Sequence, residues 1–159
     1  LEECGGLLRC LELTDSGVRR RGGRVRRGRS RDIDRAAMGD AAALSRLGLS
    51  KEAIAAVATP GGTGAIRQAL ELIRIAAPEA TVWLSAPTWP NHPSILKHLG
   101  MKAAAYRYFD EKTLAVDFTG MMADLSAVKS GDVVLLHGCC HNPTGANLNL
   151  TEWAVFCHL

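Results

Sequence analysis

The stretch that decides the fold is GDVVLLHGCCHNPTG, residues 131–145. A Gly-Asp turn leads into an apolar run at 133–136, and a short apolar run bounded by turn residues is typical of a buried strand. The loop after it holds two histidines, two cysteines and an Asn-Pro bond within nine positions. A strand that ends in a chemically rich loop favours an α/β fold, in which ligand sites form at the carboxyl ends of parallel strands.

Helix and strand patterns alternate through the residues before and after this stretch. The expected helices are one or two short ones in 41–57, one starting at Gly62 or Thr63, and others at 94–100, 119–129 and from about Thr151. The expected strands are 81–87, 103–109 and 132–138, with 88–93 a Pro-rich loop and 110–118 turn-like. This order predicts an α/β domain with a mostly parallel sheet flanked by helices. The loops TWPNHP and HGCCHNPTG should then converge on one edge of that sheet.

Composition and charge limit the classes of protein to which the sequence could belong. The chain has 159 residues, 47% of them hydrophobic, without an apolar run long enough for a membrane span or a signal peptide. We therefore expect a soluble, cytoplasmic protein with no membrane partner. The five cysteines form an odd set, and adjacent Cys139 and Cys140 are poorly placed to bridge, so reduced thiols are expected.

Basic charge is concentrated in the first 31 residues, which hold nine arginines and four acids. The run RRRGGRVRRGRSR at 19–31 contains no aromatic residue and cannot bury apolar area, so we expect 1–31 to be a disordered or non-native segment outside the working fold. A nucleic-acid partner is not favoured, because the run offers charge alone, without a stacking platform or a known binding fold.

Two loops before residue 131 contain candidate binding residues. PGGTGA at 60–65 opens a helix, so its glycines and free N–H groups could cradle an anion; a plain turn into a helix is the alternative. Trp89 lies among polar and rigid residues, where its indole suits stacking on a planar ligand or packing on the sheet edge. His92 could relay a proton, support another group by a hydrogen bond, or be structural.

The loop HGCCHNPTG admits three interpretations. A zinc site would need ligands from a second place in the chain, and the sequence offers no further Cys-X-X-Cys or His pair at ligand spacing, so no metal is predicted. A nucleophilic cysteine would need a positioned base, and Cys139 and Cys140 next to an apolar strand favour packed thiols. Asn142 is the strongest candidate, because a turn fixed at Pro143 would hold its amide toward an oxygen.

Taken in order, PGGTGA, APTWPNH and HGCCHNPTGANLNLTEW resemble the aspartate and aromatic-amino-acid aminotransferases of the class I pyridoxal-phosphate family. The resemblance runs from about Gly39 to the end of the chain. It implies that 38–159 is part of the large, cofactor-binding domain of a fold-type I pyridoxal-phosphate enzyme, and that the intact protein is a homodimer.

The resemblance also assigns roles to the candidate residues. Gly61, Gly62 and Thr63 match the turn that binds the phosphate of pyridoxal 5′-phosphate. Trp89 matches the aromatic residue that stacks on the cofactor ring and helps to contact the substrate, and Asn142 matches the asparagine that donates to the phenolic oxygen and approaches the substrate carboxylate. His92 matches a histidine behind the acid that partners the ring nitrogen. Pro87 and Pro143 match positions of cis peptide bonds.

Parts of the family pattern are not found in this sequence. None of its lysines (Lys51, Lys97, Lys102, Lys112 and Lys129) lies in the context of the Schiff-base lysine, which the family carries further along its chain, so no catalytic residue is assigned. The family's tyrosine before Gly39-Asp40 has no counterpart either. Since transamination needs that amine, we expect little or no turnover from the chain as written.

The sequence therefore predicts a fragment of an aminotransferase that moves an amino group between an L-amino acid, aspartate or aromatic, and a 2-oxo acid such as 2-oxoglutarate. The alternative from a different class is a non-catalytic protein that binds nucleic acid or an acidic surface through its Arg-rich arm. Another pyridoxal-phosphate enzyme on the same fold is a narrower possibility.

Overall fold

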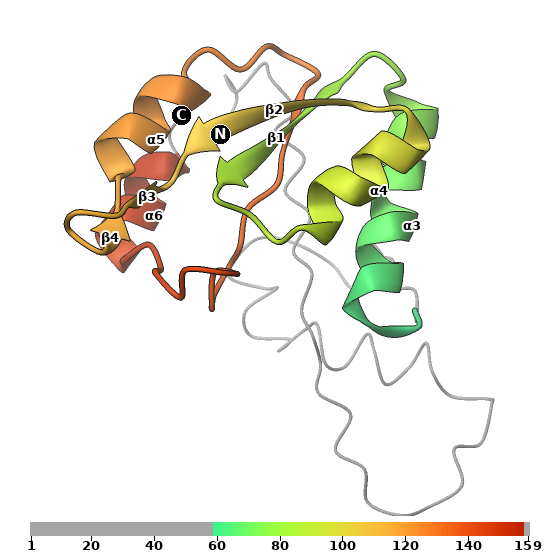
Figure 1. Cartoon of the computed structure of the whole chain (residues 1–159). Coiled ribbons are helices and arrows are strands. Elements are labelled where there is room, and N and C mark those ends of the chain that lie inside the picture. The colour runs from blue at the N-terminus through green and yellow to red at the C-terminus, as the bar shows by residue number, and fades with distance from the viewer. Residues whose placement is uncertain (1–58, 158–159) are drawn as a thin grey trace, which may run out of the picture. The chain divides into compact units, whose positions relative to one another are not determined.

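A computed structural model of the chain describes residues 59–157 (Figure 1). The helices expected in 41–57 and the Arg-rich segment 1–31 lie outside the described residues. The described residues divide between Ala65 and Ile66 into two compact units. The second unit contains the whole sheet and both loops that follow its strands.

The sheet at the centre of this unit has three parallel strands. β1 (Thr81–Ala86) lies between β2 (Lys102–Arg107) and β5 (Val133–Val134). In this register Ser85 of β1 is opposite Tyr106 of β2, and Trp83 is opposite Val134 of β5. The predicted α/β class with parallel strands is confirmed, although β5 is only two residues long where seven were expected.

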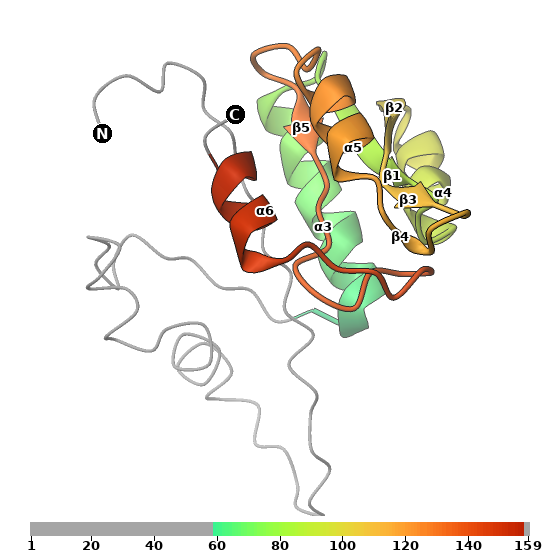
Figure 2. The same ribbon diagram turned by 90° about the vertical axis from the view of Figure 1, so that its left-hand side faces the viewer.

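Helices cover both faces of the sheet (Figure 1). On one face, α3 (Gly61–Ala76) and α4 (Asn91–Leu99) bury Leu70 and Leu96 against Val82 and Leu84 of β1. On the other face, α5 (Phe118–Leu125) and α6 (Leu150–Phe156) pack on the second core cluster, which contains Tyr106, Tyr108, Met121, Leu125, Leu148 and Phe156. Figure 2 shows these layers from the side of α6, with α3 behind. The alternation of side chains along β1 explains both clusters, because successive residues of a strand point to opposite faces.

Helix α4 begins earlier than the sequence pattern predicted. We expected 88–93 to be a loop, but the helix starts at Asn91 and contains His92 and Pro93. A proline is tolerated here because the first N–H groups of a helix have no partner within the helix. His92 is therefore placed by a helical turn, which fixes its direction more firmly than a loop would.

The segment after β2 also differs from the prediction. The expected strand 103–109 breaks at Tyr108, and the turn-like segment 110–118 contains a short antiparallel pair, β3 (Phe109–Asp110) with β4 (Ala115–Val116). Strands of two residues are too short to show alternation in the sequence. Tyr108 O accepts from Asp117 N at 2.9 Å, and this hydrogen bond closes the β3–β4 hairpin directly before α5.

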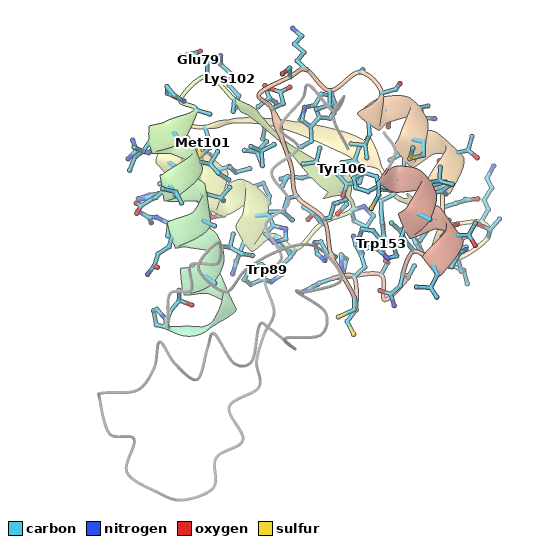
Figure 3. All side chains as sticks on the ribbon, turned by 180° about the vertical axis from the view of Figure 1, so that it is seen from behind. Glu79, Trp89, Met101, Lys102, Tyr106 and Trp153 are labelled. Carbon is cyan, nitrogen blue, oxygen red and sulfur yellow. The ribbon has the colours of Figure 1, made fainter. Side chains whose placement is uncertain are left out.

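The two ends of the sheet have different character. At the amino ends of the strands, Glu79 and Lys102 form an ion pair at 2.7 Å. Figure 3 shows this pair at one end of the sheet and Trp89 at the other. None of the helices in the described part of the chain is long and apolar enough to cross a membrane.

Candidate active site

The candidate site lies at the carboxyl edge of the sheet, where β1 and β5 end side by side. Two contacts join β1 and the start of α4 to the segment that follows β5. Ser85 Oγ lies 2.9 Å from His141 Nε2, and the rings of His92 and His137 meet edge to face with their centroids 5.3 Å apart. The prediction that the two loops converge is confirmed. The reason is topological, since parallel neighbouring strands end at the same edge.

Trp89 follows β1 at this edge and is half-buried. Its ring meets that of His92 edge to face, with centroids 5.4 Å apart, and its carbonyl accepts from His92 N at 2.9 Å. Trp89 belongs to neither core cluster of the described residues. The indole thus lies against a neighbouring ring and outside both core clusters, where it could serve as a stacking surface.

His92 is buried in the first turn of α4. Its Nδ1 forms a 2.8 Å hydrogen bond with Thr88 Oγ1. Burial, and then the neighbouring His137, lower the pKa of His92 to about 4, so the ring is neutral at neutral pH. A hydrogen bond thus connects His92 to Thr88, and a ring contact connects it to His137, next to Trp89.

His137 is a site residue that the sequence analysis did not assign. Its Nδ1 accepts from Asn142 N at 3.1 Å, and burial lowers its pKa. A neutral imidazole whose Nδ1 accepts carries its proton on Nε2. That Nε2 is buried and has no hydrogen-bond partner among the described residues. Since buried donors are normally satisfied, this N–H calls for an acceptor at the site. Its position one residue past the end of an apolar run was the available signal.

His141 was also missed, and it is the most buried polar side chain of the loop, with 2% of its surface exposed. Its ring stacks on that of Tyr108 with centroids 4.0 Å apart. Burial, followed by His137 and His92, lowers the pKa of His141 to about 4. The sequence analysis considered both loop histidines only as metal ligands, and no group of His, Cys, Asp and Glu in residues 59–157 could hold a metal ion.

Asn142 lies directly after His141, and its side chain is exposed. Its peptide bond to Pro143 is cis, as is that between Ala86 and Pro87, so both cis bonds implied by the resemblance are confirmed. The backbone of Asn142 is fixed to His137, while its amide stays accessible at the edge. The structure therefore brings the loops of Trp89, His92 and Asn142 together.

The turn at 59–65 belongs to the other compact unit and is described by itself. Gly61 has a positive φ of 75° and donates to Thr59 O at 2.9 Å as α3 begins. Gly61, Gly62 and Thr63 are exposed, and a Cβ at either glycine would meet no atom within 4 Å. The predicted helix start is confirmed to within two residues, and the first N–H groups of a helix, which have no partner within it, suit an anion.

The cysteines of the second loop are not packed in a core. Cys139, Cys140 and Cys157 are all exposed, and Cys140 has a positive φ of 50°. The interpretation of Cys139 and Cys140 as packed thiols was wrong. The chain turns outward at 138–140 before it returns at buried His141, so the apolar neighbours of the pair in sequence are not its neighbours in space.

Comparison with known proteins identifies the class. The sequence profile of the family described as "Aminotransferase class I and II" matches residues 27–158. The chain belongs to this family. The match begins before residue 38, so it includes part of the Arg-rich segment.

Individual relatives agree with this assignment. The chain is 63% identical over 107 residues to the aromatic-amino-acid aminotransferase of Paracoccus denitrificans, covering 67% of this chain and 27% of the relative. It is 46% identical over 101 residues to the aspartate aminotransferase of Salmonella typhi, covering 64% and 26%. The chain thus spans about a quarter of the length of the curated relatives it matches.

Solved structures show the same fold. An aromatic amino acid aminotransferase with 3-indolepropionic acid is similar with a TM-score of 0.62 at 62% identity, over 63% of this chain and 26% of that one. The aromatic-amino-acid aminotransferase of Burkholderia pseudomallei, covalently bound to pyridoxal phosphate, has a TM-score of 0.61 at 42% identity, over 63% and 25%. The expected fold-type I architecture is confirmed.

Proposed function

We propose that this chain forms part of the cofactor site of a pyridoxal-phosphate aminotransferase that exchanges an amino group between an aspartate or aromatic amino acid and a 2-oxo acid such as 2-oxoglutarate. The observation that supports this is the meeting of the Trp89 and Asn142 loops at one sheet edge, in a chain of the aminotransferase family. A homodimer and a cytoplasmic location belong to the same proposal and rest on the family resemblance alone.

The residues at the edge fit a flat, anionic cofactor. Trp89 offers an indole face, and Asn142 offers an exposed amide that can donate to the phenolic oxygen and approach a substrate carboxylate. Neutral His92 would stand behind the acid that partners the ring nitrogen. The unpartnered Nε2–H of His137 is consistent with a further acceptor in this place. When bound, pyridoxal phosphate supplies an electron sink for the amino acid's α-carbon.

The phosphate of the cofactor is assigned to Gly61, Gly62 and Thr63. Three properties support this assignment: the exposed glycines, the Thr63 hydroxyl, and the position of these residues in the first turn of α3, where N–H groups have no partner within the helix. An exposed threonine in a first helical turn can donate one hydrogen bond to a phosphate oxygen.

The lysines of the described residues do not suit attachment of the cofactor. Lys102 begins β2 and pairs with Glu79 at the amino end of the sheet, Lys112 lies in the β3–β4 turn, and Lys97 and Lys129 are exposed. We therefore infer that this chain contributes binding groups but no amine that accepts and returns the substrate's α-proton, and that it has no measurable turnover by itself.

Binding of pyridoxamine 5′-phosphate to the full chain, measured by calorimetry, tests the proposal. This probe lacks an aldehyde and cannot attach to surface lysines. Thr63→Val should weaken binding about fivefold, the value of one hydrogen bond of about 1 kcal/mol. Thr119→Val is the matched control, because Thr119 is an exposed threonine in the first turn of α5. Absence of saturable binding, or equal loss in both variants, would refute the phosphate assignment.

A further inference from the structure

We propose that His141 is a positioning residue, held as the neutral tautomer with its proton on Nε2. A chain of hydrogen bonds that all point in the same direction selects this tautomer. The same bonds fix the Asn142 loop to β1, β2 and the segment after β5. The chain of bonds runs from Ala146 N through the side chains of Thr144, His141, Ser85 and Tyr106 to Leu135 O. The functional meaning of this device rests on the proposed function, whereas its geometry does not.

The Tyr106 end of this hydrogen-bond chain sets its direction. Tyr106 Oη lies 2.9 Å from Leu135 O, and a carbonyl oxygen can only accept, so the phenol proton points there. At the other end, Ala146 N lies 3.2 Å from Thr144 Oγ1, and a backbone amide can only donate. A hydroxyl oxygen can accept a second hydrogen bond, so the Thr144 end is compatible with either polarity, and the Tyr106 end decides it.

The middle of the chain follows from the Tyr106 end. Ser85 is opposite Tyr106 in the strand register. Burial and the neighbouring Tyr108 raise the pKa of Tyr106, whereas a hydrogen bond from the Ser85 side chain lowers it. Since the phenol proton is used on Leu135, the Tyr106 oxygen accepts and the Ser85 hydroxyl donates. Ser85 Oγ must then accept at its 2.9 Å contact with His141 Nε2, which places the imidazole proton on Nε2.

The Thr144 contact agrees with this tautomer. With the proton on Nε2, the lone pair of His141 Nδ1 accepts from Thr144 Oγ1 at 2.8 Å, and the Thr144 oxygen remains free to accept from Ala146. The opposite tautomer would leave the Thr144 proton without the Nδ1 acceptor and would turn the Ser85 proton away from Tyr106. Because Ser85 and His141 are both buried, the loss at Ser85 would not be made good by water.

This arrangement holds the backbone around Asn142. The His141 carbonyl accepts from Gly145 N at 2.6 Å, and His141 N donates to Asn147 Oδ1 at 3.3 Å. The Tyr108 ring that stacks on His141 also donates its hydroxyl to Ala146 O at 2.8 Å. Asn142 follows His141 directly, so the direction of its amide depends on where the His141 ring is anchored.

Nitrogen-15 NMR of the histidine rings in the full chain tests the tautomer directly, because protonated and unprotonated ring nitrogens differ strongly in chemical shift. At pH 7 we expect His141 to show a protonated Nε2 and an unprotonated Nδ1. A protonated Nδ1, or a mixture of tautomers, would overturn the proposal whether or not the cofactor binds.

Two variants of Thr144 separate positioning from simple packing. Thr144→Ser keeps the hydroxyl and should keep both the tautomer and the affinity for pyridoxamine 5′-phosphate. Thr144→Val keeps the shape but loses the hydroxyl, so the affinity should fall about fivefold. Ser126→Ala, which removes a hydroxyl bonded to Ala123 O after α5, is the control and should change neither the tautomer nor the affinity.

Equal affinity in the Thr144→Val and Thr144→Ser variants would contradict the positioning role of His141. If the wild-type chain shows the expected tautomer but no binding, the proposed function fails and the hydrogen-bond chain stands.

Discussion

The rings of His92 and His137 contact each other, with their centroids 5.3 Å apart at an angle of 84°. His92 lies in the first turn of α4, the helix after β1, and His137 lies in the segment after β5. Neither ring is paired with a carboxylate in the described residues, and burial lowers the pKa of both. The contact therefore depends on both rings being uncharged, which makes this edge of the sheet sensitive to acid.

The first prediction concerns pH. His92 and His141 each have a pKa of about 4 in the folded chain, lowered first by burial, against about 6.5 when unfolded. Between pH 4 and pH 6.5 the unfolded state binds more protons than the folded state. The contribution of these histidines to the free energy of unfolding is therefore fully present above pH 6.5 and falls as the pH drops toward 4. Urea unfolding at pH 7.5 and pH 5 should differ by about 2–4 kcal/mol.

A variant at one of these histidines provides the check. His92→Gln can retain a hydrogen bond to Thr88 and removes one of the buried histidines that titrate, so the loss of stability between pH 7.5 and pH 5 should be smaller than in the wild type. A wild-type chain equally stable at both pH values would show that the buried histidines are not neutral in the folded state.

The second prediction tests how α3 packs. Leu70 is 2% exposed and contacts the β1 side of the core, whereas Leu72, two residues along the same helix, is 64% exposed. Leu70→Ala should lower the free energy of unfolding by about 2–5 kcal/mol, and Leu72→Ala by less than about 0.5 kcal/mol. The comparison is made by urea unfolding followed by circular dichroism. Similar costs for the two variants would mean that α3 does not present this face to the sheet.

The third prediction concerns the start of α5. Asp117 caps this helix by accepting from Gly120 N at 2.8 Å, and a Cβ on Gly120 would collide with the Asp117 carboxylate. Gly120→Ala should therefore cost about 1–2 kcal/mol in spite of alanine's higher helix propensity, because the cap must open. Gly62→Ala in α3, where a Cβ has open space, should be neutral or stabilising by about 0.5–1 kcal/mol. Thermal unfolding of both variants checks the contrast, which would be contradicted by a stabilised Gly120→Ala.

The sequence predicted the elements whose patterns are long and the residues whose chemistry is unusual. The start of α3, the strand β1 and the start of α6 were predicted to within one or two residues, and Trp89 and Asn142 were assigned from loops that the structure brings together. The short β3–β4 pair was missed, because two-residue strands leave no periodic pattern.

The parts of the site that escaped prediction depend on strand order. His141 bonds to Ser85, 56 positions earlier in the chain, and that contact exists only because β5 lies beside β1. Residue types in one loop suggested metal ligands or packed thiols, whereas the fold turns Cys139 and Cys140 outward and His141 inward. Local sequence does not specify which of these side chains faces the neighbouring strand.

The most direct test of the central claim is the fluorescence of the full chain during titration with pyridoxamine 5′-phosphate. If Trp89 forms the stacking surface, saturable quenching should occur in the wild type and be largely lost in Trp89→Phe. Trp153→Phe, which alters a tryptophan of α6 packed against the core, should retain the quenching. Quenching that persists unchanged in Trp89→Phe, or none in the wild type, would contradict a cofactor site at this edge of the sheet.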